Sequence, residues 1–548
     1  MLPIIHIRLT PLALALLLIG SPAHANPFDP FVPLLPVLGD GQWQDGTHVF
    51  ELDAPADGSF PTLLGLAGSG GNRGQLSLTV VGDTEDEVAA ATGVISTANG
   101  ASFVNQGSLQ ITARSGGPAA AYGVQLDDGG GLTNHGSLRV HASGQQAYVN
   151  GAILEGSTLD NTGLIEVAAD GDQFAMAIAA RGTQDMRNSG QIVARAQGGS
   201  ATAGGMAEVS EEARRIDNSG RLDVHAAATA TAGESMAIGM AKTPLTLVAT
   251  ASTLLSRGQV NVSASGGRLA QAAGMLAADP YDWSQPVLQD GRIANLGRLT
   301  VAAQATSGAA QAWGLAASGN GNEISNDGSI AVRAQGGHIG GQQCGGVPCE
   351  GNARASALAA MGDNNTLGNR GQIDVTAQGG SLDSRNKAYA YGMEANGDNN
   401  TLSNEGSIRV SAQGGQQTPS RLASAYAYGL YAEGDGSRIT NLGTLEVSAS
   451  GGSKLDGGFN FASGNAYGIM VKGTDSTIEQ HGLLMVNAQA QAGRDANAYG
   501  IYISGGGTHT LNASGRIQVA ASGGGHNRAH EVFVSKGQLD VARYHLGV

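Results

Sequence analysis

The sequence predicts an all-β fold, a parallel β-helix of about 14 rungs, and three observations support this prediction. A cassette built around a glycine, most often as Asn-x-Gly, and followed by alternating aliphatic residues returns fourteen times in the 548 residues. Successive cassette glycines lie 27 to 43 residues apart. The chain contains 86 glycines, whereas aromatic residues make up only 4% of it. A motif at this spacing is typical of a stacked repeat protein, because a thin solenoid does not need the large side chains of a globular core.

The N-terminus resembles a secretory signal peptide, which we assign to residues 1–25. Arg8 supplies a positive charge, residues 12–19 form an apolar run, and Ala23-His24-Ala25 fits a cleavage site. We therefore expect cleavage after Ala25 and export of the mature chain. Residues 26–70 precede the first well-formed cassettes and begin with a Pro- and Leu-rich stretch, so we expect them to cap the open N-terminal end of the solenoid.

Residues 71–548 form the predicted β-helix domain, in which the strand after each cassette glycine has one buried face. In the copy from Asn404 to Ala412, aliphatic residues occupy every second position and polar residues such as Arg409 lie between them. This two-residue period is that of a strand with one side in the core. Copies stacked about 4.8 Å apart convert each position into a ladder along a continuous core.

Two further strands complete the predicted rung. One precedes the cassette and reads aromatic-Gly-aliphatic-x-aliphatic, as in Tyr428-Gly429-Leu430, and a short link before the Asn supplies a strand of only a few residues. The tyrosine before each glycine shares the phase of the aliphatic residues, so we expect these rings to stack at the edge of the core. Only Tyr431 and Tyr502 fall in the outward phase of this strand.

The asparagine of the cassette recurs in eleven of the fourteen copies. Stacked Asn side chains at a β-helix corner hydrogen-bond their neighbours above and below and satisfy the backbone of the turn. We therefore interpret the row as structural rather than as a ligand-binding site. Its members are Asn72, Asn105, Asn134, Asn161, Asn188, Asn218, Asn295, Asn326, Asn369, Asn404 and Asn441.

Cys344 and Cys349, the only two cysteines, lie in the longest gap between cassette glycines. A C-x₄-C pair in an exported chain most often closes a small disulfide loop. A metal site requires more ligands, and only His338 lies nearby. The sequence therefore predicts a disulfide between these cysteines, and no metal or other cofactor.

The net charge of −15, with 30 basic and 45 acidic residues, argues against nucleic acid as a partner because no cluster of Lys and Arg is present. The acidic residues are dispersed, which suits an extended, soluble surface. No stretch of 18 apolar residues follows the signal peptide. We expect a monomer.

The signal peptide, the Gly/Ala/Asn/Ser-rich body and the repeated Asn-x-Gly-[Ser/Thr/Gln]-[Ile/Leu]-x-Val motif together resemble the passenger domains of Gram-negative autotransporters, specifically the pertactin-like right-handed β-helix. The resemblance covers about residues 70–548. It implies a right-handed parallel β-helix, export through the inner membrane into the periplasm, and display or release at the cell surface, commonly as an adhesin or structural stalk. The partner would be a host or environmental surface ligand, protein or glycan.

Autotransporters end in a translocator barrel built from many lipid-facing strands. Only 33 residues follow Gly515 (548 − 515), so we expect no translocator within this chain. The resemblance then leaves three alternatives open: a truncated or split gene, a passenger served by a separate outer-membrane translocator, or a protein that stays in the periplasm.

A β-helical polysaccharide lyase or glycoside hydrolase is the alternative function. Such enzymes place carboxylates and an Arg or Lys on the outward face of neighbouring rungs, along which a sugar chain can lie. The predicted outward positions offer two such groups: Arg139, Glu166 and Asp223, and then Asp374, Arg409 and Glu446.

Alternating charge is also what a surface ladder needs to avoid self-repulsion. Two carboxylates two rungs apart would be separated by roughly 9–10 Å, which is marginal even for an inverting pair. We therefore expect no catalytic residues, and binding through the long loops between rungs, because loops vary while rungs stay regular. The candidate contact loops are Gly336–Ala353, Gly414–Ser424 and Gly451–Gly464.

Overall fold

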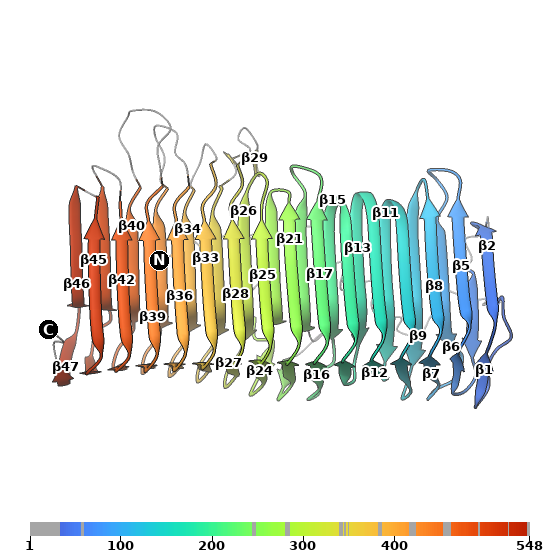
Figure 1. Cartoon of the computed structure of the whole chain (residues 1–548), viewed down its shortest axis with the longest axis horizontal. Coiled ribbons are helices and arrows are strands. Elements are labelled where there is room, and N and C mark those ends of the chain that lie inside the picture. Colours follow the sequence, from blue (N-terminus) through green and yellow to red (C-terminus); the bar gives the residue numbers. More distant parts are fainter. Residues whose placement is uncertain are drawn as a thin grey trace.

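The computed structural model describes residues 33–55, 60–243, 248–279, 285–338, 343–344, 347–348, 350–381, 386–415, 423–452, 462–490, 494–523 and 525–544. Within these ranges every helix or strand element is a β-strand. Figure 1 shows the strands side by side along one elongated coil, running from the N-terminal end in blue to the C-terminal end in red. The described residues contain no helix long and apolar enough to cross a membrane. The expected all-β parallel β-helix is confirmed.

The first sheet consists of short strands, most of which end at the asparagine of a cassette. Its 16 strands pair in parallel and in chain order, so each turn of the coil adds one strand. They are β1 (Gln42–Gln44), β4 (Gly70–Asn72), β7 (Ser102–Asn105), β10 (Gly131–Asn134), β12 (Thr158–Asn161), β14 (Met186–Asn188), β16 (Arg215–Asn218), β20 (Thr253–Ser256), β24 (Arg292–Asn295), β27 (Glu323–Asn326), β32 (Thr366–Asn369), β35 (Thr401–Asn404), β38 (Arg438–Asn441), β41 (Thr477–Gln480), β44 (Thr508–Ala513) and β47 (Gln538–Tyr544).

The second sheet consists of the strands that follow the cassette glycine. They are β2 (Thr47–Asp53), β5 (Gln75–Gly82), β8 (Ser108–Ser115), β17 (Arg221–Ala228), β21 (Gln259–Gly266), β25 (Arg298–Gln304), β28 (Ser329–Gln335), β33 (Gln372–Gln378), β36 (Ser407–Gln413), β39 (Thr444–Ser450), β42 (Leu483–Gln489) and β45 (Arg516–Ser522).

The third sheet contains the aromatic-Gly strands. They are β3 (Thr62–Leu66), β6 (Ala89–Ser96), β9 (Pro118–Asp127), β18 (Glu234–Lys242), β22 (Leu269–Ala277), β26 (Ala309–Ser318), β31 (Ala353–Met361), β34 (Ala388–Asn396), β37 (Ala425–Glu433), β40 (Gly464–Lys472), β43 (Asp495–Ile503) and β46 (His526–Val534).

Three long strands run through both the second and the third sheet: β11 (Ser137–Glu155), β13 (Leu164–Gly182) and β15 (Gln191–Glu208). Two small pairings lie outside the main sheets. Strand β19 (Ala249–Thr250) pairs in parallel with β23 (Leu288–Gln289), and β29 (Gln343–Cys344) pairs in antiparallel fashion with β30 (Val347–Pro348).

The strands extend beyond the fourteen cassettes at both ends. Strands β1 and β2 already pair in parallel with β4 and β5, so part of the segment assigned to the cap, residues 26–70, coils as a rung. At the other end β47 adds a further short strand. The extra N-terminal rung escaped the cassette pattern because its turn at Gly46 lacks the preceding asparagine.

The core follows the predicted alternation in the second sheet. Leu445, Val447 and Ala449 are at most 2% exposed, and they pair in register with Ile408, Val410 and Ala412 of the preceding rung. One continuous apolar cluster contains these residues and their equivalents along the helix. Because the inward ladder ends in alanine, the cross-section narrows where the second sheet meets the next corner.

The asparagine column runs along the corner between the first and second sheets. The Nδ2 of Asn369 donates to the Oδ1 of Asn404 at 2.8 Å, and the Nδ2 of Asn404 donates to the Oδ1 of Asn441 at 2.8 Å. The same amide-to-amide bond, 2.7 to 2.9 Å long, links each asparagine to the next. One uninterrupted run extends from Asn72 to Asn218 and another from Asn295 to Asn441. Ser256 lies between the two runs.

The tyrosines of the third sheet stack as expected, but the prediction that they share the phase of the core aliphatic residues is wrong. Tyr391, Tyr428 and Tyr431 belong to a cluster separate from the main core. The cause is the glycine after the ring. A Cβ on Gly429 would lie 2.7 Å from the Cδ1 of the core residue Leu445, so both Gly429 and Leu430 face inward. The alternation therefore shifts by one residue, and the tyrosines on both sides of this pair face outward.

The outward rings stack along the helix axis. The Tyr391 and Tyr428 centroids are 4.8 Å apart with planes 11° from parallel, and the column continues through Tyr467 and Tyr499 to His530. Burial raises the pKa of Tyr391, Tyr428 and Tyr467. Because each ring covers the faces of its neighbours, the ring faces of this column are not available for a flat ligand.

Candidate binding surface

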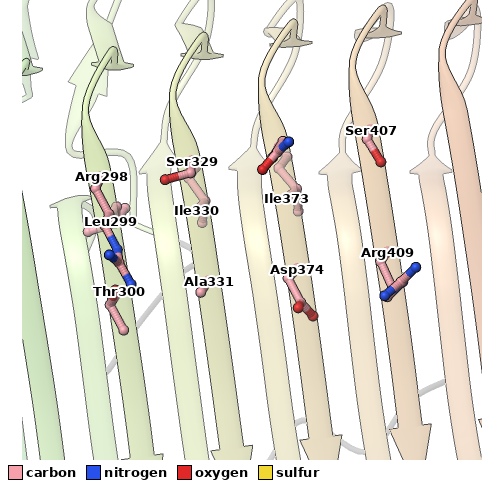
Figure 2. A pocket seen from close by; sticks show the side chains of 11 residues that line it. Arg298, Leu299, Thr300, Ser329, Ile330, Ala331, Ile373, Asp374, Ser407 and Arg409 are labelled. Carbon is pink, nitrogen blue, oxygen red and sulfur yellow. The ribbon is translucent and has the colours of Figure 1, made fainter.

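The outward face of the second sheet contains a shallow polar groove. It has a volume of 440 Å³ and crosses four consecutive strands, β25, β28, β33 and β36. Figure 2 shows its lining residues, most of which occupy outward positions, while the core residues Leu299, Ile330 and Ile373 lie between them. Arg298 and Arg409 lie at opposite ends of the groove, with Ala331 and Asp374 on the two strands between them.

The groove exists because of the size of its outward residues. Ala331 pairs in register with Thr300 on one side and Asp374 on the other, and its methyl group leaves the sheet uncovered between longer side chains. Ser329 and Ser407, in the column above, are also short. The remaining polar lining residue, Gln372, adds an amide, so hydroxyl, amide and charged groups surround the depression.

A second depression of 370 Å³ continues the groove toward the C-terminus. It shares Arg409 with the first and crosses β36, β39, β42 and β45. Six strand spacings separate β25 from β45, which corresponds to roughly 29 Å along the helix axis. The two depressions together therefore suit an elongated ligand lying along the axis better than a compact one.

The first group of candidate catalytic residues forms a surface charge ladder. Glu166 binds two arginines from neighbouring rungs, with the Nε of Arg139 at 3.3 Å and the Nη1 of Arg195 at 2.8 Å from its carboxylate oxygens. Asp223 lies two strands from Glu166, accepts from the Nε of Arg221 at 2.6 Å, and is 5% exposed. Neither carboxylate faces a second acid in the way that a hydrolytic pair requires.

The second group lies in the groove. The Nη2 of Arg409 is 2.8 Å from the Oε2 of Glu446, so these two charges compensate each other. Asp374 pairs in register with Arg409 but makes no ion pair within the described residues. Among the candidate carboxylates, Asp374 is therefore the one that remains available to a ligand.

The three predicted contact loops follow strands that line the groove or the second depression. Gly336, Gly414 and Gly451 come directly after β28, β36 and β39, and each backbone N–H donates to the carbonyl that ends the strand of the next rung. Residues 339–342, 345–346 and 349 of the first loop, 416–422 of the second and 453–461 of the third lie outside the described residues. The starting points lie at the carboxyl ends of these strands, whereas the groove is lined by the first three residues of each strand, roughly 16 Å away along β28.

The signal peptide and its cleavage site at Ala25 lie outside the described residues, as does Cys349. Cys344 ends strand β29, which forms a two-stranded hairpin with β30 just before Cys349. Among the residues that the structure describes, no group of three His, Cys, Asp or Glu side chains could hold a metal ion.

We predict that Cys344 and Cys349 are oxidised to a disulfide in protein collected from the periplasm or medium. The hairpin of β29 and β30 folds the chain back immediately before Cys349. Peptide mass spectrometry after alkylation without reduction should find neither thiol modified, and reduction should expose both. Alkylation of both cysteines in unreduced, exported protein would contradict the prediction.

Comparison with known proteins gives one partial match. A family model described as the BigA third pectate lyase-like domain matches residues 345–460, about a fifth of the chain. No curated protein and no solved structure matches the chain. The matched segment includes β33 and β36, which line the groove, and β36 and β39, which precede two of the contact loops.

Proposed function

We propose that this protein is an exported, non-catalytic β-helical adhesin or stalk, similar to an autotransporter passenger, that binds a surface ligand through the groove and through the contact loops of the same rungs. The observation that carries the proposal is the coincidence of three features on the rungs of β28 to β39. The groove crosses these rungs, the three contact loops start from them, and the pectate lyase-like match spans most of them. The remaining rungs supply length.

The arrangement of carboxylates supports binding over catalysis. Lyases and hydrolases need a general acid or base held against the substrate, and glycoside hydrolases use two carboxylates across the bond that breaks. Of the carboxylates lining the two depressions, Glu446 is paired with Arg409, and Asp374 stands on the floor without a second acid beside it. The pectate lyase-like match favours the enzyme only through its fold, and a fold does not fix a function.

The protein should bind at least one member of a panel of extracellular matrix proteins and polysaccharides, without degrading any polymer. Ala331→Trp should abolish that binding, because an indole at this position fills the groove between Thr300 and Asp374. Binding is measured by biolayer interferometry on immobilised ligands, and turnover by the release of reducing ends or unsaturated products.

Glu166→Gln and Asp374→Asn separate the alternatives. Turnover of any polymer that is lost in either variant, or in Asp223→Asn, would establish the enzyme and reject the adhesin. Binding that survives Ala331→Trp unchanged would remove the groove from the proposal. Circular dichroism of each variant establishes that the fold is retained.

A further inference from the structure

The groove lies in a locally basic part of an acidic protein. The whole chain has a net charge of −15, yet Arg298 and Arg409 line the groove together with one available carboxylate, Asp374. Arg333 lies two residues beyond Ala331 on the same strand and the same face, roughly 7 Å away. Arg298 and Arg409 therefore line the groove, and Arg333 lies next to it.

Two of these guanidinium groups lack an ionic partner. Arg298 and Arg333 make no ion pair or side-chain hydrogen bond with the described residues, in contrast to Arg409, which binds Glu446. Two outward arginines elsewhere on this sheet are compensated, because Arg139 and Arg195 share Glu166. An unpaired, planar guanidinium at the edge of a groove is suited to bidentate recognition of a carboxylate or sulfate group.

The rest of the lining favours a hydroxylated ligand. Thr300, Ser329, Gln372 and Ser407 offer hydroxyl and amide groups that donate and accept hydrogen bonds. The lining of both depressions contains no aromatic ring on which a nucleic-acid base could stack. The stacked tyrosines belong to the third sheet, and their ring faces cover one another.

We propose that this groove binds an acidic polysaccharide whose carboxylate or sulfate groups pair with Arg298 and Arg333 and whose hydroxyl groups bind Ser329, Gln372 and Ser407. This inference rests on the proposed binding function and adds the class of ligand. The polymer lies along the helix axis, since the depression continues past Arg409 to β45. Arg409 forms an ion pair with Glu446, so it lines the groove but its charge is already compensated.

The test compares immobilised hyaluronan, which carries carboxylates, with dextran sulfate, which carries sulfates, and with neutral dextran. The protein should bind at least one acidic polymer and not dextran, and the affinity should fall as salt rises. Arg298→Gln and Arg333→Gln should each weaken that binding roughly tenfold, the size expected for losing one charge-assisted contact. Which of the two acidic polymers binds tells carboxylate from sulfate recognition.

Arg139→Gln is the matched control. It removes the same charge from the same face of the second sheet, five strands from β25 or roughly 24 Å away, and Arg195 still compensates Glu166. Its affinity should equal that of the unmodified protein. An equal loss in the control would show a nonspecific effect of net charge and overturn the inference.

The outcomes also separate this inference from the binding function itself. If Ala331→Trp abolishes binding while Arg298→Gln and Arg333→Gln change nothing, the groove binds its ligand but not through acidic groups, and only the present inference fails. Equal binding of dextran and dextran sulfate, or no binding of either acidic polymer, overturns it as well. Stronger binding to single-stranded DNA than to either polysaccharide would assign the groove to a different class of polymer.

Discussion

Replacing Gly371 with alanine is expected to disrupt the helix locally and to cost on the order of 3 kcal/mol or more. A Cβ at this position would lie well inside the contact distance of the backbone carbonyl oxygen of Gly328 on the preceding rung. That oxygen accepts the backbone N–H of Gln372 at 2.9 Å. Because the obstacle is backbone rather than a flexible side chain, the two rungs must move apart. The steric strain of the added methyl group and the loss of the hydrogen bond between the rungs then both lower the stability.

Gly368→Ala is the matched control, three residues away on the preceding short strand β32. No atom lies within 4 Å of a Cβ built at Gly368, and its backbone does not require glycine. Its unfolding free energy should change by no more than about 0.5 kcal/mol. Urea unfolding followed by circular dichroism measures both variants. Similar unfolding free energies for the two variants would show that the close approach of neighbouring rungs does not require glycine at the cassette position.

Removing either partner of the buried pair Glu208–Lys242 is expected to cost about 3–5 kcal/mol, since the other charge is left uncompensated inside the protein. The two side chains are 1% and 0% exposed and form an ion pair across neighbouring rungs. The Nζ of Lys242 also donates to the carbonyl oxygen of Ser210 at 2.7 Å. Burial lowers the pKa of Lys242 despite the adjacent carboxylate, so the pair retains a desolvation cost.

The double replacement Glu208→Leu with Lys242→Met should therefore restore most of the stability lost by each single change. The same column holds Leu154 two rungs before Glu208, so the site accommodates an apolar side chain. Unfolding of Glu208→Leu, Lys242→Met and the double variant forms a double-mutant cycle. A double variant as unstable as the sum of the singles would show that the charges stabilise the fold beyond satisfying each other.

The sequence predicted those features that repeat with a strict period. The alternation after Gly406 correctly placed Ile408 and Val410 in the core, because every rung repeats the same two-residue pattern. The third sheet was misjudged because Gly429 occupies an inward position of its own and shifts the alternation, so Tyr428 faces outward. A glycine that directly follows an aromatic residue and precedes an aliphatic residue, as in Tyr428-Gly429-Leu430, is the sequence signal for this shift in the alternation.

The groove could not be predicted from the sequence, for a different reason. The outward positions were predicted correctly, but a depression depends on which side chains are short on three adjacent strands at once. Ala331 was not singled out, because its importance comes only from the register that places it between Thr300 and Asp374. The pair Glu208–Lys242 was missed since its partners are 34 residues apart and each looks like an ordinary surface charge.

The alternation of the second sheet has an evolutionary consequence. Inward residues such as Ile408 determine whether a rung fits its neighbours, whereas outward residues such as Arg409 face solvent and contribute little to that fit. Mutations at outward positions therefore change recognition with little selective penalty on folding. Copying or deleting a whole repeat lengthens or shortens the surface while leaving the remaining rungs intact. A lineage with this architecture can diversify its ligands faster than its fold.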